Sequence, residues 1–415
     1  MANGKIRVFV VDDSSVFVKF LTEGLAAEDP RIEIVGYAMN PSEAIRKIPT
    51  AKPDVVTMDI EMPKINGIEF LKELLPTYLV PVILVSSLNV SVFDALANGA
   101  VDFVKKPDMS RDYSAKFFIT NLTNKVIGAS TARVQLPRAL RNANAASQSS
   151  AGSAGAGSVS VGGRASASGS AASAPRFTAG ARVQADNGQN SASGSASAAV
   201  KTRTASPTII LPNSMRITGS KSKMDHTVIA LGASTGGTEA TLQVLQQLPA
   251  DTPGIVITQH MPEGFTAMYA QRLNRLCKME VKEAVDGEVI SRGKILIAPG
   301  GSRHMKVVRL GGHYTVSLFT ADKVNGHCPS VDVLFRSVAQ TVKSDAVGII
   351  LTGMGQDGAY GLLEMRKAGA YTIGQNKESC VVYGMPMVAQ NIGAVAIQAA
   401  CETIPNVLLN YLNKL

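Results

Sequence analysis

The chain has 415 residues, which is enough for two or three domains, and 45% of them are hydrophobic. The sequence contains no run of eighteen apolar residues and no signal-peptide pattern, so we expect a cytoplasmic protein that does not insert into a membrane. The four cysteines are scattered without metal-ligand spacing, which indicates reduced thiols.

The formal net charge of +9 would suggest a nucleic-acid partner if it lay on a folded surface. It is instead concentrated in residues 109–225, which hold 14 Lys or Arg against 3 Asp or Glu, whereas residues 1–108 carry a net −4 and residues 226–415 a net +2. Aromatic side chains are not interleaved with these charges, as base stacking would need. We therefore interpret the charge as solvation of a linker and expect no nucleic-acid partner.

Residues 5–108 alternate between short apolar strands and helices. The predicted strands are residues 6–12, 33–38, 55–59, 82–86 and 102–106, and the predicted helices are residues 15–26, 42–48, 67–75 and 92–97. Five βα repeats of this length predict a doubly wound parallel sheet of the flavodoxin type, in which ligands bind beyond the carboxyl ends of the strands.

Polar side chains stand at these strand ends. Asp12 and Asp13 follow the first strand and Asp59 ends the third. Clustered carboxylates repel one another unless they share a cation, so they imply a hard divalent ion. Ser86 ends the fourth strand and Lys106 the fifth, and a hydroxyl and an ammonium near a carboxylate could bind the oxygens of a transferred phosphoryl group. Any one of these residues alone could be a helix cap, but all five at successive strand ends favour a phosphoryl site.

This stretch resembles the response-regulator receiver domain over its whole length. The matching segments are VDDS at 11–14, MDIEMPKINGIEF at 58–70, the serine pair 86–87 and KKP at 105–107. The resemblance implies that Asp59 accepts a phosphoryl group from a histidine kinase. The Mg²⁺ ligands that it implies are Asp12, Asp13, Asp59 and the backbone of Glu61. The residues that it implies for phosphate sensing are Ser86, Lys106 and, at the aromatic switch position, Phe103.

A long tether follows. Residues 113–127 have helical spacing and should close the first domain, whereas residues 143–200 contain no Leu, Ile or Met. Such a segment cannot bury enough apolar surface to offset its ordering entropy, so we expect a flexible tether with an r.m.s. span of about 50–60 Å. An apolar patch, TIILP at 208–212, could dock transiently and is assigned no function. The predicted domains are a receiver at 1–128, a linker at 129–223 and a catalytic domain at 224–415.

The stretch VIALGASTGG at 228–237 organises the last part of the chain. Its β-branched start predicts a buried strand that breaks at Gly232, and the residues from Thr238 onward predict an amphipathic helix. Ser234 would then lie on a Gly-x-Ser-x-Gly elbow, where the following amides can stabilise an oxyanion. A tight turn with a serine N-cap is an equally good interpretation of this pattern alone.

A serine nucleophile needs a base and a group that orients the base. All five histidines follow residue 225, and His260 ends the predicted strand one βα unit after Ser234. Because adjacent parallel strands lie about 5 Å apart, we predict that His260 is the base, with His327 as the weaker alternative. The alternative without a catalytic role is that His260 caps a helix or packs in the core.

The orienting acid is predicted to be Asp357. It follows the buried strand of AVGIILTGMGQDGA and a glycine-rich turn, so it lies at the same sheet edge and at a helix N-terminus. A simple N-cap is the structural alternative. The order Ser, His, Asp along the chain differs from that of α/β-hydrolases and points to a separate, Rossmann-like fold.

These residues resemble the catalytic domain of the chemotaxis protein-glutamate methylesterase/protein-glutamine glutaminase (CheB) family. The matching segments are LGASTGGTEA at 231–240, QHMPEGFTAMYAQRLN at 259–274, IAPGG at 297–301, PSVDVLF at 329–335 and LTGMGQDGA at 351–359. The preceding receiver completes the family's architecture. The resemblance implies Ser234 as nucleophile, His260 as base and Asp357 as orienting acid, with Thr235 and Met354 at the oxyanion and substrate-positioning edge.

The implied reaction is hydrolysis of glutamate methyl esters on methyl-accepting chemotaxis receptors, with release of methanol, and deamidation of receptor glutamines. Phosphorylation of Asp59 would relieve a blockage of the active site by the receiver, although the tether looks longer than the family's usual linker. We expect a monomer and no cofactor for the esterase, because no cluster in this domain has metal-ligand spacing. The alternatives are an esterase for a methylated protein outside chemotaxis and a non-catalytic, phosphorylation-dependent scaffold.

Overall fold

The computed structural model describes residues 4–62, 67–87, 91–108, 112–134, 136 and 216–415, all within one compact unit of the chain. Most of the predicted tether, with the apolar patch at 208–212, lies outside these residues. The predicted domain boundaries stay predictions. Helix α5 (Asp112–Ala129) ends beside the first of them, and the second falls within α7 (Lys221–His226). Among the described residues, no helix combines the length and the apolar character that a bilayer span requires.

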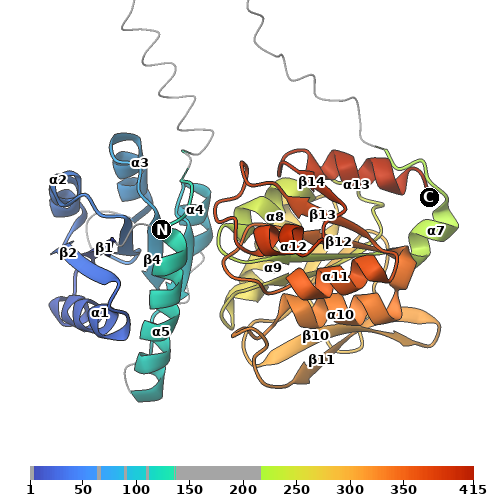
Figure 1. Ribbon diagram of the computed structural model, residues 1–415, viewed down its shortest axis with the longest axis horizontal. Helices are drawn as coiled ribbons and strands as arrows, with labels where there is room; N and C mark the ends of the chain where they lie inside the picture. Colours follow the sequence, from blue (N-terminus) through green and yellow to red (C-terminus); the bar gives the residue numbers. More distant parts are fainter. Residues whose placement is uncertain (1–3, 63–66, 88–90, 109–111, 135, 137–215) are drawn as a thin grey trace, which may run out of the picture. The chain divides into compact units, whose positions relative to one another are not determined.

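The predicted five-stranded parallel sheet of the first domain is confirmed (Figure 1). Its strands, in spatial order, are β2 (Ile32–Ala38), β1 (Ile6–Val11), β3 (Val55–Asp59), β4 (Val82–Ser86) and β5 (Asp102–Lys105). The helices besides α5 are α1 (Ser15–Glu28), α2 (Pro41–Ala51), α3 (Gly67–Thr77) and α4 (Ser91–Ala97). The continuous apolar runs of β3 and β4 are buried along their whole length, as helices on both faces of a parallel sheet require.

Helix α2 is longer than the predicted 42–48. The Asn40 side chain accepts a hydrogen bond from the Glu43 N–H at 2.9 Å, and Pro41 fits the first turn because its missing N–H would be unpaired there. At the other end the helix continues through Pro49 and closes with Lys52 in the left-handed conformation. The proline therefore marks the last turn rather than the end of the helix.

The second domain is built on a seven-stranded parallel sheet, which confirms the predicted fold class (Figure 1). Its strands, in spatial order, are β14 (Ile397–Ala399), β13 (Tyr371–Gln375), β12 (Ala346–Ile350), β6 (Val228–Ala233), β7 (Gly254–Gln259), β9 (Lys294–Ile297) and β8 (Glu280–Glu283). The chain moves outward from β6 through β7 and later returns to place β12 on the other side of β6. In such open sheets, ligands bind where the strand order reverses, at the carboxyl ends of the strands.

Alternating side chains of β6 supply the two cores of this domain. Val228 and Ala230 face one core, while Ile229 and Leu231 face the other. The first core is covered by α10 (Val331–Thr341), α11 (Ala359–Lys367), α12 (Met385–Asn391) and the antiparallel hairpin of β10 (Arg303–Leu310) and β11 (His313–Thr320). The second is covered by α7, α8 (Gly237–Leu245), α9 (Phe265–Leu276) and α13 (Ile404–Leu412). A 3₁₀ turn, η1 (Lys343–Asp345), leads into β12.

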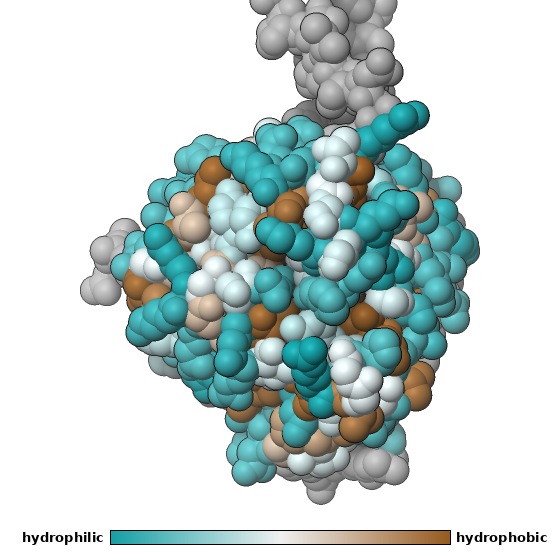
Figure 2. Space-filling view, turned by 90° about the vertical axis from the view of Figure 1, so that its right-hand side faces the viewer, coloured by the Kyte–Doolittle hydropathy of each residue, from teal (hydrophilic) through white to brown (hydrophobic). Residues whose placement is uncertain are grey.

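One face of the molecule is mostly hydrophilic, with hydrophobic side chains scattered among polar ones (Figure 2). Scattered apolar side chains are normal on a soluble surface and mark no site by themselves. The carboxyl ends of the strands are the better candidates for a site.

Candidate active site

Ser234 lies on a sharp elbow between β6 and α8 and is almost fully buried. Its own N–H donates to the Thr352 carbonyl at 3.0 Å, and its carbonyl accepts from the Gly237 N–H at 2.7 Å. Gly236 has φ +74°, a left-handed conformation that a side chain would strain, which is why the elbow needs glycine there. The predicted Gly-x-Ser-x-Gly elbow is therefore present in the fold.

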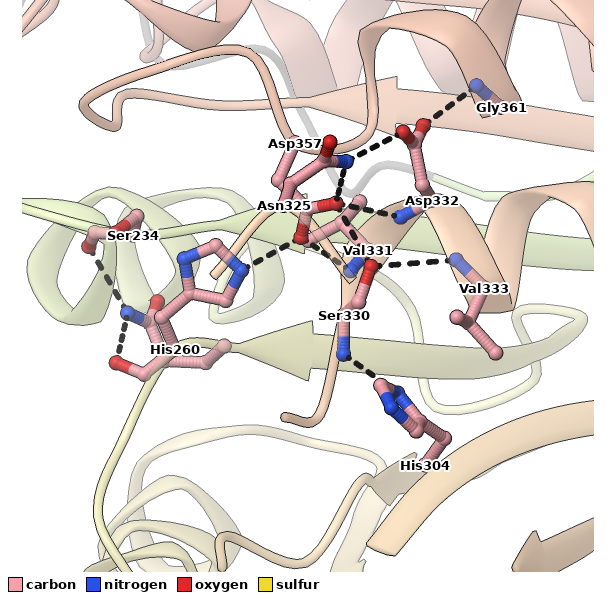
Figure 3. Close-up of polar contacts among 11 residues, drawn as sticks. Ser234, His260, His304, Asn325, Ser330, Val331, Asp332, Val333, Asp357 and Gly361 are labelled. Carbon is pink, nitrogen blue, oxygen red and sulfur yellow. Dashed lines mark hydrogen bonds and ion pairs between the residues drawn. The ribbon is translucent and has the colours of Figure 1, made fainter. Parts of the chain in front are cut away.

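His260 follows β7, the neighbour of β6, and its N–H donates to the Ala233 carbonyl at 3.1 Å. Its Nε2 lies 2.8 Å from Asp357 Oδ2. Its Nδ1 is buried and has no hydrogen-bond partner among the described residues. Figure 3 shows this second ring nitrogen on the side of Ser234. A buried nitrogen without a partner needs an explanation, and a reacting hydroxyl supplies one.

Asp357 follows β12 and forms the centre of a hydrogen-bond cluster (Figure 3). Its carboxylate accepts from Asn325 Nδ2 at 2.9 Å, Ser330 Oγ at 2.7 Å, the Val331 N–H at 2.7 Å and the Asp332 N–H at 3.2 Å, besides His260. The amides that Asp357 binds belong to the start of α10. Asp357 therefore does not act as a simple N-cap of α11, the helix that follows it in sequence.

The electrostatics of Asp357 follow from this cluster. Burial alone would raise the pKa of its carboxyl group, but the hydrogen bonds from His260, Asn325 and Ser330 outweigh burial and hold the pKa well below its usual range. Asp357 is therefore ionised at neutral pH. An ionised partner at 2.8 Å makes Nε2 the protonated nitrogen of His260 and leaves Nδ1 with its lone pair free.

Thr235 and Met354 border the elbow in different ways. Thr235 is buried, and its Oγ1 donates to Asp102 Oδ2 of β5 at 2.5 Å. Met354 lines a cavity of about 360 Å³ together with Gly128, Tyr383 and other residues of both domains.

Sequence reasoning missed several residues of this site. Asn325 and Ser330 contact Asp357, and Gln259 Nε2 donates to the Ser234 carbonyl at 2.9 Å. Ser330 and Gln259 stand inside segments that the sequence analysis had singled out, so their polar character was the available signal. Asn325 offered only an Asn-Gly pair, which is typical of any tight turn.

The receiver acids also meet. Asp12, Asp13 and Asp59 present carboxylate oxygens that all lie within 4.8 Å of one another. Lys106 Nζ lies 2.7 Å from Asp59 Oδ2 and 3.3 Å from Asp12 Oδ2. Burial raises the pKa of Asp12, and although burial would lower the pKa of Lys106, the two carboxylates raise it. Ionic partners thus surround the predicted phosphorylation site.

Three further residues predicted for this site have defined places. The Glu61 N–H donates to Asp59 Oδ1 at 3.0 Å, which puts the Glu61 backbone beside the acids. Ser86 is buried at the end of β4 and its Oγ donates to the Ser87 carbonyl at 3.0 Å. Phe103 is buried, and its ring centroid lies 4.7 Å from that of Phe265 in α9.

Two protein-family models match the chain. The CheB methylesterase family matches residues 229–408, and the response regulator receiver domain family matches residues 8–115. A protein-glutamate methylesterase/protein-glutamine glutaminase 2 of Syntrophomonas wolfei is 42% identical over 411 residues, covering 99% of each chain. The protein-glutamate methylesterase/protein-glutamine glutaminase of Syntrophotalea carbinolica is 41% identical over 395 residues, covering 94% of this chain and 92% of that one. Both folded domains are therefore matched in one relative.

Proposed function

Because the chain belongs to the CheB family of protein-glutamate methylesterases/protein-glutamine glutaminases, we propose that Ser234, His260 and Asp357 carry out its hydrolysis. The protein is a receiver-regulated enzyme of chemotactic adaptation, and it demethylates glutamate methyl esters and deamidates glutamines. The observation that carries the residue assignment is the buried Nδ1 of His260, which has no hydrogen-bond partner among the described residues while the Nε2 of the same ring is bound to an ionised Asp357.

The proposed reaction has two halves. Ser234 Oγ attacks the carbonyl carbon of the glutamate γ-ester while His260 Nδ1 takes the hydroxyl proton. The bond to the methoxy oxygen then breaks, His260 returns the proton, and methanol leaves an acyl-enzyme behind. Water attacks this acyl-enzyme with the same base and releases glutamate and Ser234. A glutamine side chain follows the same route with ammonia as the leaving group, and Asp357 stabilises the imidazolium in both halves.

The oxyanion donors are proposed from the amides that are not bound to other residues of the catalytic domain among those described. The Ser234 N–H already donates to the Thr352 carbonyl, so it is not a candidate. The next amides, those of Thr235 and Gly236, start the turn into α8, whose N-terminus favours negative charge. We therefore propose that Thr235 borders the position of the substrate carbonyl, together with Met354, which lines the cavity described above.

We propose that the receiver blocks this edge. The Gly236 N–H donates to the Val101 carbonyl at 3.2 Å, and Thr235 Oγ1 donates to Asp102. Lys125 Nζ holds the other oxygen of Asp102 at 2.7 Å, which fixes the carboxylate in place. A receptor carbonyl would need the same donors that the start of β5 occupies here.

Phosphorylation of Asp59 is proposed to relieve this block. Lys106, one residue beyond β5, binds the unmodified Asp59, and Phe103 packs on Phe265. A phosphoryl group on Asp59 would offer Lys106 and Ser86 new oxygens at the carboxyl end of β5. A shift of this short strand would also move its amino end, where Val101 and Asp102 touch the elbow.

The acidic site fits a Mg²⁺ ion. Its three carboxylates converge and one of them is buried with a raised pKa, an arrangement that a divalent cation would stabilise. Asp12, Asp13, Asp59 and the Glu61 backbone would hold the ion, and its charge would neutralise the phosphoryl oxygens. We further propose a histidine kinase as phosphodonor, methyl-accepting chemotaxis receptors as substrates, action in the cytoplasm, and a monomer.

The test is methanol release from methyl-labelled receptor membranes, with and without a small-molecule phosphodonor and Mg²⁺. We expect release by the wild type, faster release with the phosphodonor, and none by Ser234→Ala. Activity that survives in Ser234→Ala would overturn the triad. Activity that is present but indifferent to the phosphodonor would overturn the proposed relief of the block and leave the triad intact.

A further inference from the structure

A tight turn between β11 and α10 reaches the proposed catalytic pair from outside the triad. The N–H groups and carbonyls of Val324 and His327 exchange two hydrogen bonds of 3.0 Å. Asn325 and Gly326, at the tip, have φ values of +53° and +81°, the geometry for which an Asn-Gly pair is favoured. Residues 324–327, here called the 324–327 turn, therefore form a short rigid unit.

Asn325 joins two buried carboxylates. Its Nδ2 donates to Asp357 Oδ1 at 2.9 Å and to Asp332 Oδ2 at 2.7 Å, as Figure 3 shows. Asp332 is almost fully buried, burial raises its pKa, and its other oxygen accepts from the Gly361 N–H at 2.6 Å. One amide nitrogen thus supplies a hydrogen to each acid, and it fixes where Asp357 stands relative to α10 and α11.

His327 covers one face of the proposed base. The two imidazole rings are stacked, with centroids 3.6 Å apart and planes inclined by 10°. Burial, with help from the neighbouring His260, lowers the pKa of His327 to about 3, so its ring is neutral at the pH of the reaction. A neutral ring against the face of His260 restricts rotation of the base and presents its π-face to the imidazolium that forms during the reaction.

We propose that Asn325 and His327 are positioning residues, through which the single 324–327 turn holds Asp357 and His260 so that Nδ1 faces Ser234. The inference rests on the proposed triad and extends it. Neither residue transfers a proton in this account. Asn325 acts through the carboxylate and His327 acts through the ring that it covers. Since misplacement of a reacting group by about 1 Å can cost about 100-fold in rate, loss of either contact should lower kcat.

The backbone suggests the variants. Asn325→Gly removes the amide without strain, because glycine accepts φ +53° freely. Its matched control is Lys343→Gly. Lys343 is another non-glycine residue with positive φ, at +59°, and it lies before the amino end of β12, whereas Asp357 follows the carboxyl end of that strand. His327→Ala removes the stacked ring, and His327→Phe keeps a neutral aromatic face while removing both nitrogens.

The assay compares kcat and KM for methanol release by the full-length, phosphodonor-activated enzyme on methylated receptor membranes. A second readout is the rate at which a fluorophosphonate labels Ser234, since it reports activation of the nucleophile without receptor binding. Asn325→Gly and His327→Ala should lower kcat and the labelling rate about 10- to 100-fold, with KM within about twofold of wild type. His327→Phe and Lys343→Gly should stay within about threefold.

Several results would overturn the inference. Normal kcat and labelling in Asn325→Gly and His327→Ala would remove both positioning roles. A His327→Phe variant as inactive as Ser234→Ala would make His327 a proton-transfer group instead. If Asn325→Gly proves unfolded, Asn325→Asp is the second variant, because it keeps the size and turn preference of the residue. It places a carboxylate beside those of Asp332 and Asp357, so kcat should fall at least as much as is expected for Asn325→Gly. Activity retained in Ser234→Ala would signal failure of the triad itself, which is a separate outcome.

Discussion

Replacing Asp102 by alanine should activate the unphosphorylated enzyme. Asp102 is buried and accepts a hydrogen bond of 2.5 Å from Thr235 Oγ1, the residue next to the proposed nucleophile. Lys125 holds the same carboxylate at 2.7 Å, so this contact is charge-assisted and preorganised. Removing it takes away an interaction that exists only while the receiver covers the elbow.

The size of the effect follows from the type of bond. A hydrogen bond to a charged group contributes about 1.5–3 kcal/mol, and each 1.4 kcal/mol is about tenfold in an equilibrium. A loss of about 2 kcal/mol from the covered state should therefore raise basal methanol release by about 10- to 30-fold, up to the rate of the phosphorylated enzyme. Asp102→Asn keeps an acceptor for Thr235 but loses the charge, so its gain should be only about fivefold.

The assay is methanol release from labelled receptor membranes without phosphodonor. The matched control is Glu43→Gln, which removes another receiver carboxylate, paired with Lys47 at 2.6 Å on α2, and should leave basal release unchanged. Asp59 should remain phosphorylatable in all variants, which shows that the receiver is folded. Basal release within twofold of wild type in Asp102→Ala, with activation by phosphodonor intact, would refute the role of this contact.

Three further predictions concern the triad, the switch and acid stability. Asp357→Asn should lower kcat for methanol release by about 10³- to 10⁴-fold, since a neutral amide no longer fixes Nε2 as the protonated nitrogen; a loss below tenfold would contradict the tautomer assignment. Asp59→Asn, or chelation of Mg²⁺ in the wild type, should abolish the response to phosphodonor and leave basal release in place, and a remaining response would place the phosphorylation site elsewhere. Burial lowers the pKa of His327 from 6.5 to about 3, and the charged or titratable groups around it are His260, Asp357, Lys323 and Lys125. Between pH 6.5 and pH 3, the unfolded chain therefore binds a proton at this residue that the folded chain does not bind. The free energy of unfolding should therefore fall by about 2.5 kcal/mol through this residue between pH 7 and about pH 4.5. Urea denaturation should show a shallower pH dependence in His327→Phe, and equal slopes would contradict this prediction.

The parallel sheets were predictable because their signal is local. A buried strand such as β3 is a continuous apolar run, and its last residue, Asp59, is fixed at the sheet edge by the strand itself. The same reasoning brought Ser234, His260 and Asp357 to one edge, since each follows a strand and the three strands β12, β6 and β7 are neighbours.

The surroundings of these residues were not predictable in the same way. Asn325 reaches Asp357 across 32 positions of sequence, from a turn whose place depends on how β11 and α10 pack. The choice of Nδ1 as the free nitrogen of His260 depends on ring orientation, which no sequence pattern encodes. Sequence patterns predict which residues lie at the ends of strands, but they do not predict contacts that single side chains make across the fold.

The proposed triad requires that Ser234 forms the covalent intermediate and that His260 acts as its base. The most direct measurement is mass spectrometry of enzyme that was acid-quenched during turnover of a methylated receptor fragment. A glutamyl adduct on the peptide that contains Ser234, absent from Ser234→Ala and strongly reduced in His260→Ala, is the predicted result. Turnover without any adduct on that peptide, or an adduct on another residue, would contradict the claim.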